Sequence, residues 1–249
     1  MTVIDTHCHI GDFTPLFKGN HVVADLTREH DAAQVDSGFL SILSGDMVSC
    51  NEATRVACEQ NPGRIFGVIY LDPTDDRALA ELERCVQNAF FKGVKLHPSE
   101  DAWFPYMEQY FPLYERIEAH GLPILFHSGT HPHSNPLAIA AAARHFPNVP
   151  FILGHFGLAD LSWECFPAAE LSKNVYVDTT ANPMVRVLGE WVERFGAERM
   201  LWGSDFPFYN VAYEKMKINY ITSSARDREL ISYINAIRIY GLDEPGKDG

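Results

Sequence analysis

Two histidines lie two residues apart near the start of the chain, in the stretch Val3-Ile4-Asp5-Thr6-His7-Cys8-His9. Successive side chains of a β-strand point to opposite faces, so a strand here projects His7 and His9 in the same direction. The turn residues Gly11 and Asp12 predict that the strand ends just after this pair. Two imidazoles at the end of one strand are a natural start for a divalent metal site.

Other residues that can bind a metal or carry a proton also end short apolar runs later in the chain. Ionisable groups are costly to bury unless they are paired or bind a metal, so five runs that end in this way, counting the one with His7 and His9, are hard to explain by packing alone. We therefore predict that these side chains meet His7 and His9 in one site. The residues are Lys95, His97, His127, His155 and Asp205.

The elements that must position these residues alternate between strands and helices along the whole chain. This alternation predicts a parallel sheet with helices outside it, and eight such units in this length favour a (β/α)8 TIM barrel. In a TIM barrel all strands end at one rim, where active sites lie. The predicted strands cover residues 3–9, 39–43, 65–71, 93–97, 123–127, 151–155, 175–179 and 200–205. The predicted helices cover 26–35, 51–60, 78–89, a segment ending near 120, 136–146, 164–172, 184–195 and 227–240.

The first strand is not followed by a glycine-rich phosphate-binding motif, which argues against an open dinucleotide-binding sheet. No composition shift or linker marks a second domain, so we predict a single α/β barrel domain over residues 1–249. Four histidines fall on predicted helices or loops and are expected at the surface. They are His21, His30, His120 and His145.

The composition of the chain argues against nucleic acids and membranes as binding partners. The 249 residues carry a formal net charge of -13, and no basic run could neutralise nucleic-acid phosphates. No apolar run is long enough to cross a membrane, and no signal peptide is evident. The five scattered cysteines indicate reduced thiols of a cytoplasmic protein, and Cys8 is expected to face the helices. A small molecule is the remaining class of partner.

Five ordered motifs resemble the amidohydrolase superfamily. The resemblance is strongest to its amidohydrolase-related branch, which includes aminocarboxymuconate-semialdehyde decarboxylase. It implies a metal-dependent enzyme built on a distorted barrel, and it suggests a homodimer. The motifs are Ile4-Asp5-Thr6-His7-Cys8-His9, Gly93-Val94-Lys95-Leu96-His97-Pro98, Phe126-His127, Gly154-His155 and Leu201-Trp202-Gly203-Ser204-Asp205-Phe206-Pro207.

The same resemblance implies one Zn²⁺ ion held by a set of four side chains, with Mn²⁺ or a second ion as alternatives. His155 is then expected to lie close to a metal-bound water, and His155 and Asp205 are the catalytic candidates. The implied metal ligands are His7, His9, His127 and Asp205.

The role of Lys95 stays open between three alternatives. It can bind a substrate carboxylate, it can be carboxylated and bridge two ions as in the two-metal members of the superfamily, or it can pair with an acid such as Asp5. His97 shares the strand face of Lys95 and is expected to contact substrate. Trp103, in the aromatic loop that follows, is expected to roof the pocket and to contact substrate as well.

The predicted reaction is hydrolytic attack on an amide, lactone or ester carbon by an activated water. The first alternative is non-oxidative decarboxylation of an unsaturated or aromatic acid at the same site. The chain is shorter than the decarboxylases it resembles, which favours hydrolysis. The second alternative is a barrel that binds a ligand without catalysis, and the completeness of the ligand set argues against it.

Overall fold

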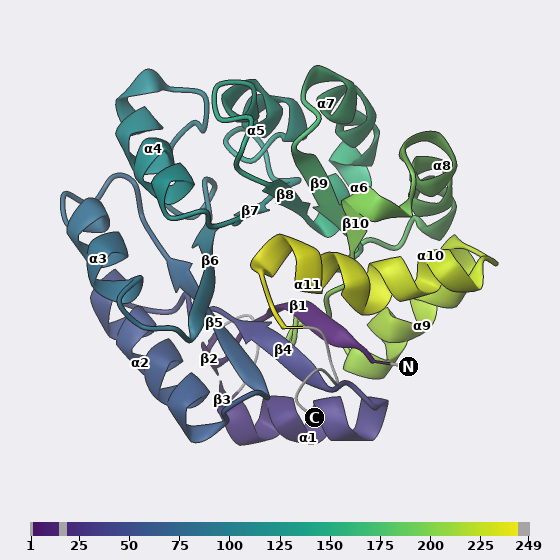
Figure 1. Ribbon diagram of the computed structural model, residues 1–249, viewed down its shortest axis with the longest axis horizontal. Helices are drawn as coiled ribbons and strands as arrows, with labels where there is room; N and C mark the ends of the chain where they lie inside the picture. The colour runs from purple at the N-terminus through teal and green to yellow at the C-terminus, as the bar shows by residue number, and fades with distance from the viewer. Residues whose placement is uncertain (1, 15–18, 244–249) are drawn as a thin grey trace.

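The computed structural model describes residues 2–14 and 19–243, and in this part of the chain eight parallel strands form one sheet that closes into a barrel (Figure 1). Each strand pairs with the next one along the chain, which is the expected order of a TIM barrel. The strands are β1 (Ile4–Cys8), β4 (Ser37–Leu40), β5 (Ile65–Tyr70), β6 (Phe91–Leu96), β7 (Ile124–His127), β8 (Phe151–Gly154), β9 (Val175–Asp178) and β10 (Met200–Leu201).

Helices follow the strands and form the outer ring seen in Figure 1. They bury their apolar sides against the outer face of the sheet, as amphipathic helices do in this fold. The α-helices of the described residues, including α11 outside this ring, are α1 (Val23–Ala33), α2 (Met47–Gln60), α3 (Ala78–Cys85), α4 (Phe111–Ala119), α5 (Pro136–Ala143), α6 (Leu158–Leu161), α7 (Cys165–Leu171), α8 (Val185–Phe195), α9 (Val211–Ile221), α10 (Ala225–Glu229) and α11 (Asn235–Tyr240).

The last helix, α11, crosses one end of the barrel instead of joining the outer ring (Figure 1). Ala236, Ile239 and Tyr240 of this helix pack in one apolar cluster with residues at the starts of the strands, such as Ile4 and Phe39. This packing closes the amino-terminal end of the barrel. The carboxyl-terminal end is therefore the end that remains available for a ligand.

The barrel closes between its first and last strands, although β10 has only two residues. The backbone amides of Thr6 and His9 donate to the carbonyls of Trp202 and Phe206, at 3.0 and 2.7 Å. The amide of Asp205 donates in return to the carbonyl of His7, at 2.7 Å. Closure thus places the first histidine pair directly beside the motif that contains Asp205.

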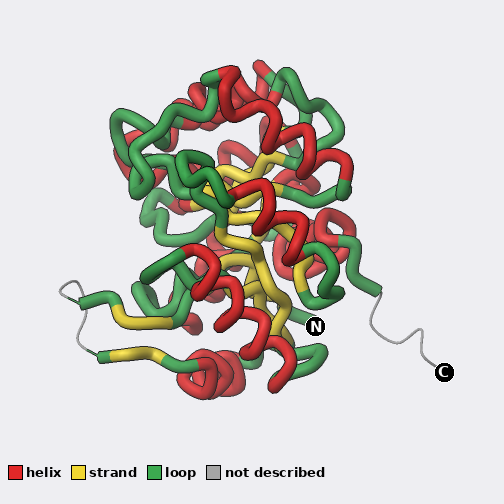
Figure 2. The backbone as a smooth tube through the Cα atoms, turned by 90° about the vertical axis from the view of Figure 1, so that its left-hand side faces the viewer, coloured by secondary structure: helices red, strands yellow, loops and turns green. Residues whose placement is uncertain are grey.

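The structure differs from the predicted elements in several places. The helix predicted over 227–240 is divided into α10, a π-helical turn over 230–234 and α11, and the strand predicted over 200–205 is limited to β10. Helix α9 was not predicted, because its apolar residues do not follow one helical face. The segment from Gly11 to Asp25, predicted as a loop, contains the short antiparallel hairpin β2 (Gly11–Asp12) and β3 (Asn20–His21), which projects beyond the barrel in Figure 2. Residues 15–18 of that segment lie outside the described part of the chain.

None of the helices within residues 2–14 and 19–243 has the length and apolar character that crossing a membrane requires.

Candidate metal centre and substrate cavity

A cavity of about 640 Å³ opens at the end of the barrel where the strands finish. Its volume is in the range of cavities that hold a small organic molecule. Ionisable side chains from the strand ends and aromatic side chains from the loops line it together. The ionisable residues include His9, Lys95, His97, His127, His155 and Asp205, and the aromatic residues include Phe13, Tyr70, Phe208 and Tyr209.

His7, at the carboxyl end of β1, is fixed by a carboxylate from β9, which is separated from β1 only by the closing strand β10. Its Nδ1 donates to Oδ2 of Asp178 at 2.8 Å, and both side chains are fully buried. Oδ1 of Asp178 also accepts the backbone amide of His155 at 2.7 Å. Burial, and then the Lys95 ammonium, hold the pKa of His7 well below its usual value, so its Nε2 keeps a lone pair.

His9 is held in the same way by a backbone group. Its Nδ1 donates to the carbonyl of Ser41 at 2.7 Å, which leaves Nε2 unprotonated in the neutral ring. That Nε2 lies 3.6 Å from Oδ1 of Asp205, and Nε2 of His7 lies 3.8 Å from the same oxygen. The predicted common direction of His7 and His9 is therefore observed, and both lone pairs face one carboxylate.

Asp205 and His155 both occupy the left-handed backbone region, with φ of 55° and 64°. Residues other than glycine rarely adopt this conformation, and they do so mainly where the surrounding structure fixes them at functional sites. Nδ1 of His155 lies 4.0 Å from Oδ2 of Asp205 and has no hydrogen-bond partner among the described residues. Burial raises the pKa of Asp205 well above its usual value.

Two glycines let the neighbouring strands approach the His7 ring. A Cβ atom on Gly203 would lie 2.6 Å from Cβ of His7, and one on Gly154 would lie 3.1 Å from its Cε1. The first distance is too short for any side chain. Glycine at position 203 is therefore required where the last strand passes the first.

Lys95, the last but one residue of β6, is completely buried. Its Nζ lies 2.9 Å from Nε2 of His7, and burial lowers the pKa of this amine to about 8. The predicted alternative of a pair between Lys95 and Asp5 is not found. The ammonium instead lies beside Nε2 of His7, the atom that a metal would require as its ligand. The Lys95 side chain would therefore have to move away from His7 before a cation could bind there.

His97 and His127 form a stacked pair on the cavity wall. Their ring centroids are 4.0 Å apart, and the ring of His127 also lies 4.7 Å from that of His155. Nε2 of His127 lies 2.9 Å from the hydroxyl of Thr130, and Nδ1 of His97 accepts the backbone amide of Glu100. Burial lowers the pKa of both rings, that of His97 to about 3, so the pair is neutral.

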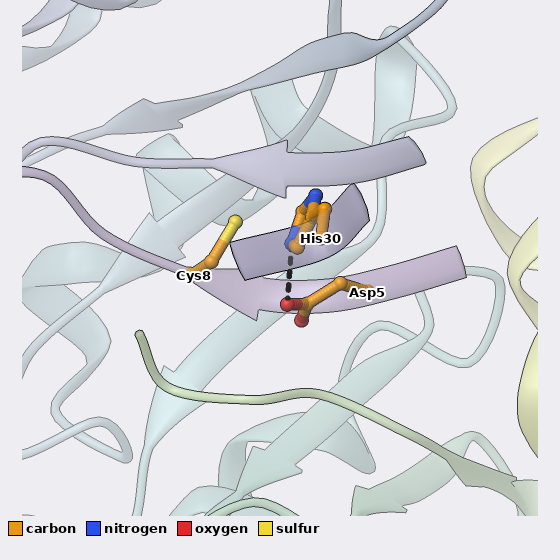
Figure 3. A group of neighbouring side chains, drawn as sticks. All are labelled: Asp5, Cys8 and His30. Carbon is orange, nitrogen blue, oxygen red and sulfur yellow. Dashed lines mark hydrogen bonds and ion pairs between the residues drawn. The ribbon is translucent and has the colours of Figure 1, made fainter. Parts of the chain in front are cut away.

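A second buried group lies directly behind this site (Figure 3). Asp5 accepts hydrogen bonds from the amide and hydroxyl of Ser204, from the amide of His7 and, at 3.0 Å, from Nε2 of His30 on α1. The prediction that His30 lies at the surface is wrong, because this pair with Asp5 allows a histidine in the core. Cys8 faces the helix side as expected, and its thiol donates to the carbonyl of Phe39. The Asp5 carboxylate therefore ties the residue before Asp205 to the strand that carries His7.

The donor atoms at the carboxyl end fit a divalent cation. The ligating atoms of His7, His155 and Asp205 lie within 4.8 Å of one another, and all three side chains are buried. Neutral imidazoles with one carboxylate suit zinc or manganese. The unpartnered Nδ1 of His155 is the kind of buried atom that a bound ion or substrate satisfies.

Six of the eight predicted site residues line this cavity, His7 lies just behind the lining beside Lys95 and Asp205, and Trp103 lies apart from it. Trp103 is 1% exposed and packs against Tyr110 in the core, outside the cavity lining. Sequence reasoning missed Asp178, whose position at the end of an apolar strand was the available signal. It also missed Tyr70, which ends β5 on the cavity wall.

Comparisons with known proteins agree with this architecture. A gamma-resorcylate decarboxylase from Polaromonas sp. (strain JS666 / ATCC BAA-500) is 25% identical over 274 residues, covering 89% of this chain and 79% of the relative. The crystal structure of 2,6-dihydroxybenzoate decarboxylase from Rhizobium superimposes with a TM-score of 0.77 at 18% identity, covering 98% of this chain and 99% of that one. The 5-carboxyvanillate decarboxylase from Novosphingobium aromaticivorans, solved with manganese, gives a TM-score of 0.80 at 14% identity, covering 97% and 96%.

The family profile described as amidohydrolase matches residues 4–242, which include every strand of the barrel and every ionisable residue of the cavity. This match confirms the resemblance drawn from the five sequence motifs. The chain belongs to the amidohydrolase family.

Proposed function

We propose that this protein is a metal-dependent decarboxylase that removes the carboxylate of a small aromatic acid as CO2 without oxidation. The proposal of a metal-dependent enzyme is supported by the strand-end histidines, the Asp205 carboxylate and the buried Lys95 ammonium that lie together at one end of the barrel. The curated relatives are decarboxylases, which supports this alternative better than the hydrolase predicted from chain length. The sequence-based choice of zinc remains a prediction, since a related structure contains manganese.

In this proposal the cation is held by His7, His9 and Asp205, with His127 exchanging the hydroxyl of Thr130 for the ion. When bound, the cation supplies Lewis-acid stabilisation of negative charge on the substrate oxygens. The hydrogen bonds to Asp178 and Ser41 fix the tautomers of His7 and His9, so that the nitrogen facing the cavity is unprotonated.

The reaction breaks the bond between the ring carbon and the carboxylate carbon. The electron pair stays on the ring carbon, which takes up one proton, and CO2 leaves. The proton comes from water. We assign its relay to His155, because burial keeps the pKa of this ring well below its usual value and its unpartnered Nδ1 can accept a proton as the ring passes one on to the substrate. Lys95 orients the carboxylate before it leaves, as the buried cation of the cavity lining.

The test compares CO2 release with hydrolysis over one panel of substrates. Protein reconstituted with manganese or zinc is expected to release CO2 from 2,6-dihydroxybenzoate or a related hydroxylated acid, and to leave lactones, esters and amides intact. Removal of the metal by a chelator is expected to abolish turnover, and added metal is expected to restore it. Hydrolysis of lactones without CO2 release, or full activity after chelation, would refute the proposal.

A further inference from the structure

Four consecutive residues immediately after β8 have positive φ angles, and the first of them is His155. The φ angles are 64° for His155, 46° for Phe156, 69° for Gly157 and 51° for Leu158. Leu158 combines its φ with a ψ of -165°, a region of backbone space that is essentially confined to glycine. Residues other than glycine keep such conformations only where the surrounding structure holds them. The segment 155–158 must therefore be held by groups outside it.

The side chain of Asn182 holds this segment. Its Nδ2 lies within hydrogen-bond distance of three backbone carbonyls, those of His155 and Phe156, both at 3.2 Å, and that of Leu158, at 2.9 Å. The same amide donates to the hydroxyl of Ser162 at 2.8 Å, and Asn182 is fully buried. Buried carbonyls need hydrogen-bond donors, so position 182 requires a side chain that donates.

Asn182 is itself fixed by a buried ion pair on α9. The Lys217 ammonium donates to the carbonyls of Thr179 and Asn182, at 2.8 and 3.0 Å. Oε2 of Glu214 accepts the amide of Ala181 at 3.1 Å and lies 2.5 Å from the ammonium. Both charged side chains are almost completely buried. Helix α9 therefore holds the loop that carries Asn182 from both of its charged groups.

The direction of the His155 ring depends on its backbone. The Asp178 carboxylate accepts the amide of His155 at 2.7 Å, and Asn182 binds its carbonyl, so both ends of the residue are held. In this conformation Nδ1 of the ring lies 4.0 Å from Oδ2 of Asp205. Relaxation to an ordinary negative φ would rotate the bond from Cα to Cβ and turn the ring away from Asp205.

We propose that Asn182, held by Glu214 and Lys217, is a positioning residue that keeps His155 in its left-handed conformation and directs its ring toward Asp205. This inference rests on the proposed function for the proton relay that His155 carries out. The placement of the ring can be examined without turnover.

The test compares Asn182→Ala with the matched control Asn174→Ala in manganese-loaded protein. Both variants leave buried carbonyls unpaired, so both are expected to lower the melting temperature. Only Asn182→Ala is expected to lower kcat for CO2 release, by about 10- to 100-fold and with KM within about twofold of the wild type, because the relay group is misplaced while the substrate contacts remain. Asn174 lies just before β9, at the opposite end of the barrel from the cavity, and its Nδ2 also donates to three carbonyls, those of Ala143, Phe146 and Val149.

A crystal structure of Asn182→Ala provides a readout that does not depend on activity. His155 is expected to leave the left-handed region, with its Nδ1 farther than 4.0 Å from Asp205. Wild-type kcat, an equal loss of kcat in Asn174→Ala, or an unmoved His155 would overturn the role of Asn182. A displaced His155 in a protein whose wild type releases no CO2 from any acid would refute the proposed reaction and leave the positioning role intact.

A milder variant keeps the test decisive if Asn182→Ala fails to fold. Asn182→Ser retains one donor for three carbonyls, so the same displacement of His155 and about a threefold loss of kcat are expected. Wild-type kcat together with an unmoved His155 in this variant would also overturn the role of Asn182.

Discussion

Replacing Asp205 by asparagine is expected to reduce kcat for CO2 release by about 10³-fold or more while the protein remains folded. Asparagine has nearly the same shape, but it removes the carboxylate that His7, His9 and His155 all face within 4.0 Å. The backbone bond from residue 205 to the carbonyl of His7 does not depend on the side chain. The loss should therefore appear in turnover and in metal content, and the melting temperature of the metal-free protein should change little.

The control for this variant is Asp160→Asn on α6. Asp160 is exposed, and its helix follows the loop that carries His155, so the control removes the same charge near the same end of the barrel. It is expected to keep wild-type turnover and wild-type metal content. If Asp205→Asn retained more than a tenth of wild-type turnover, Asp205 would be neither a metal ligand nor a catalytic group.

Replacing Lys95 by methionine is expected to lower kcat/KM by about 10- to 100-fold, mainly through KM, because a charge-assisted hydrogen bond to the substrate is lost. Methionine fills a similar volume, and removal of an ammonium that is completely buried should not destabilise the fold. Steady-state kinetics with the hydroxylated acid and thermal melting measure these two effects separately. Lys92→Met on the same strand is the matched control, since Lys92 lies outside this cavity.

The same variant separates two of the roles predicted for Lys95. A lysine that binds the substrate carboxylate leaves the metal content unchanged when it is replaced. A carboxylated lysine that bridges two ions loses bound metal together with activity. One ion per chain in both the wild type and Lys95→Met, with a raised KM in the variant, supports the first role. A fall in metal content would establish the second.

The barrel and the meeting of its strand ends could be predicted because both follow from local patterns. An apolar run that ends in a histidine or aspartate indicates where a buried strand reaches the carboxyl-terminal end of the barrel. The fold brings all of these strand ends to one rim. His7, His9, His155 and Asp205 accordingly meet at one cavity. The alternation of side chains along one strand was enough to place His7 and His9 on the same face.

The partners that fix these residues could not be predicted, because they come from elements far apart in the chain. Asp178 lies 171 residues from His7, and Asp5 binds Ser204 across 199 residues. His30 looked like a surface residue because nothing in its helix reports a buried acid on the neighbouring strand. Trp103 was expected at the cavity because an aromatic loop residue gives no sign of whether it packs inward or onto a ligand.

The pattern of strand-end residues could not predict whether the enzyme catalyses hydrolysis or decarboxylation. Both reactions use the same cation and the same acid, so His7, His9, His155 and Asp205 do not distinguish them. Residues on the wall of the cavity, such as Tyr70 at the end of β5, lie outside the pattern of strand-end histidines and acids.

The central claim is that one divalent cation occupies the space enclosed by His7, His9 and Asp205. Anomalous diffraction from crystals of the manganese-loaded protein tests this claim most directly. The account predicts a manganese peak within coordination distance of Nε2 of both histidines and of an Asp205 oxygen, with the Lys95 ammonium withdrawn from His7. A metal peak elsewhere, or an active protein whose crystals show no metal at these three residues, would contradict it.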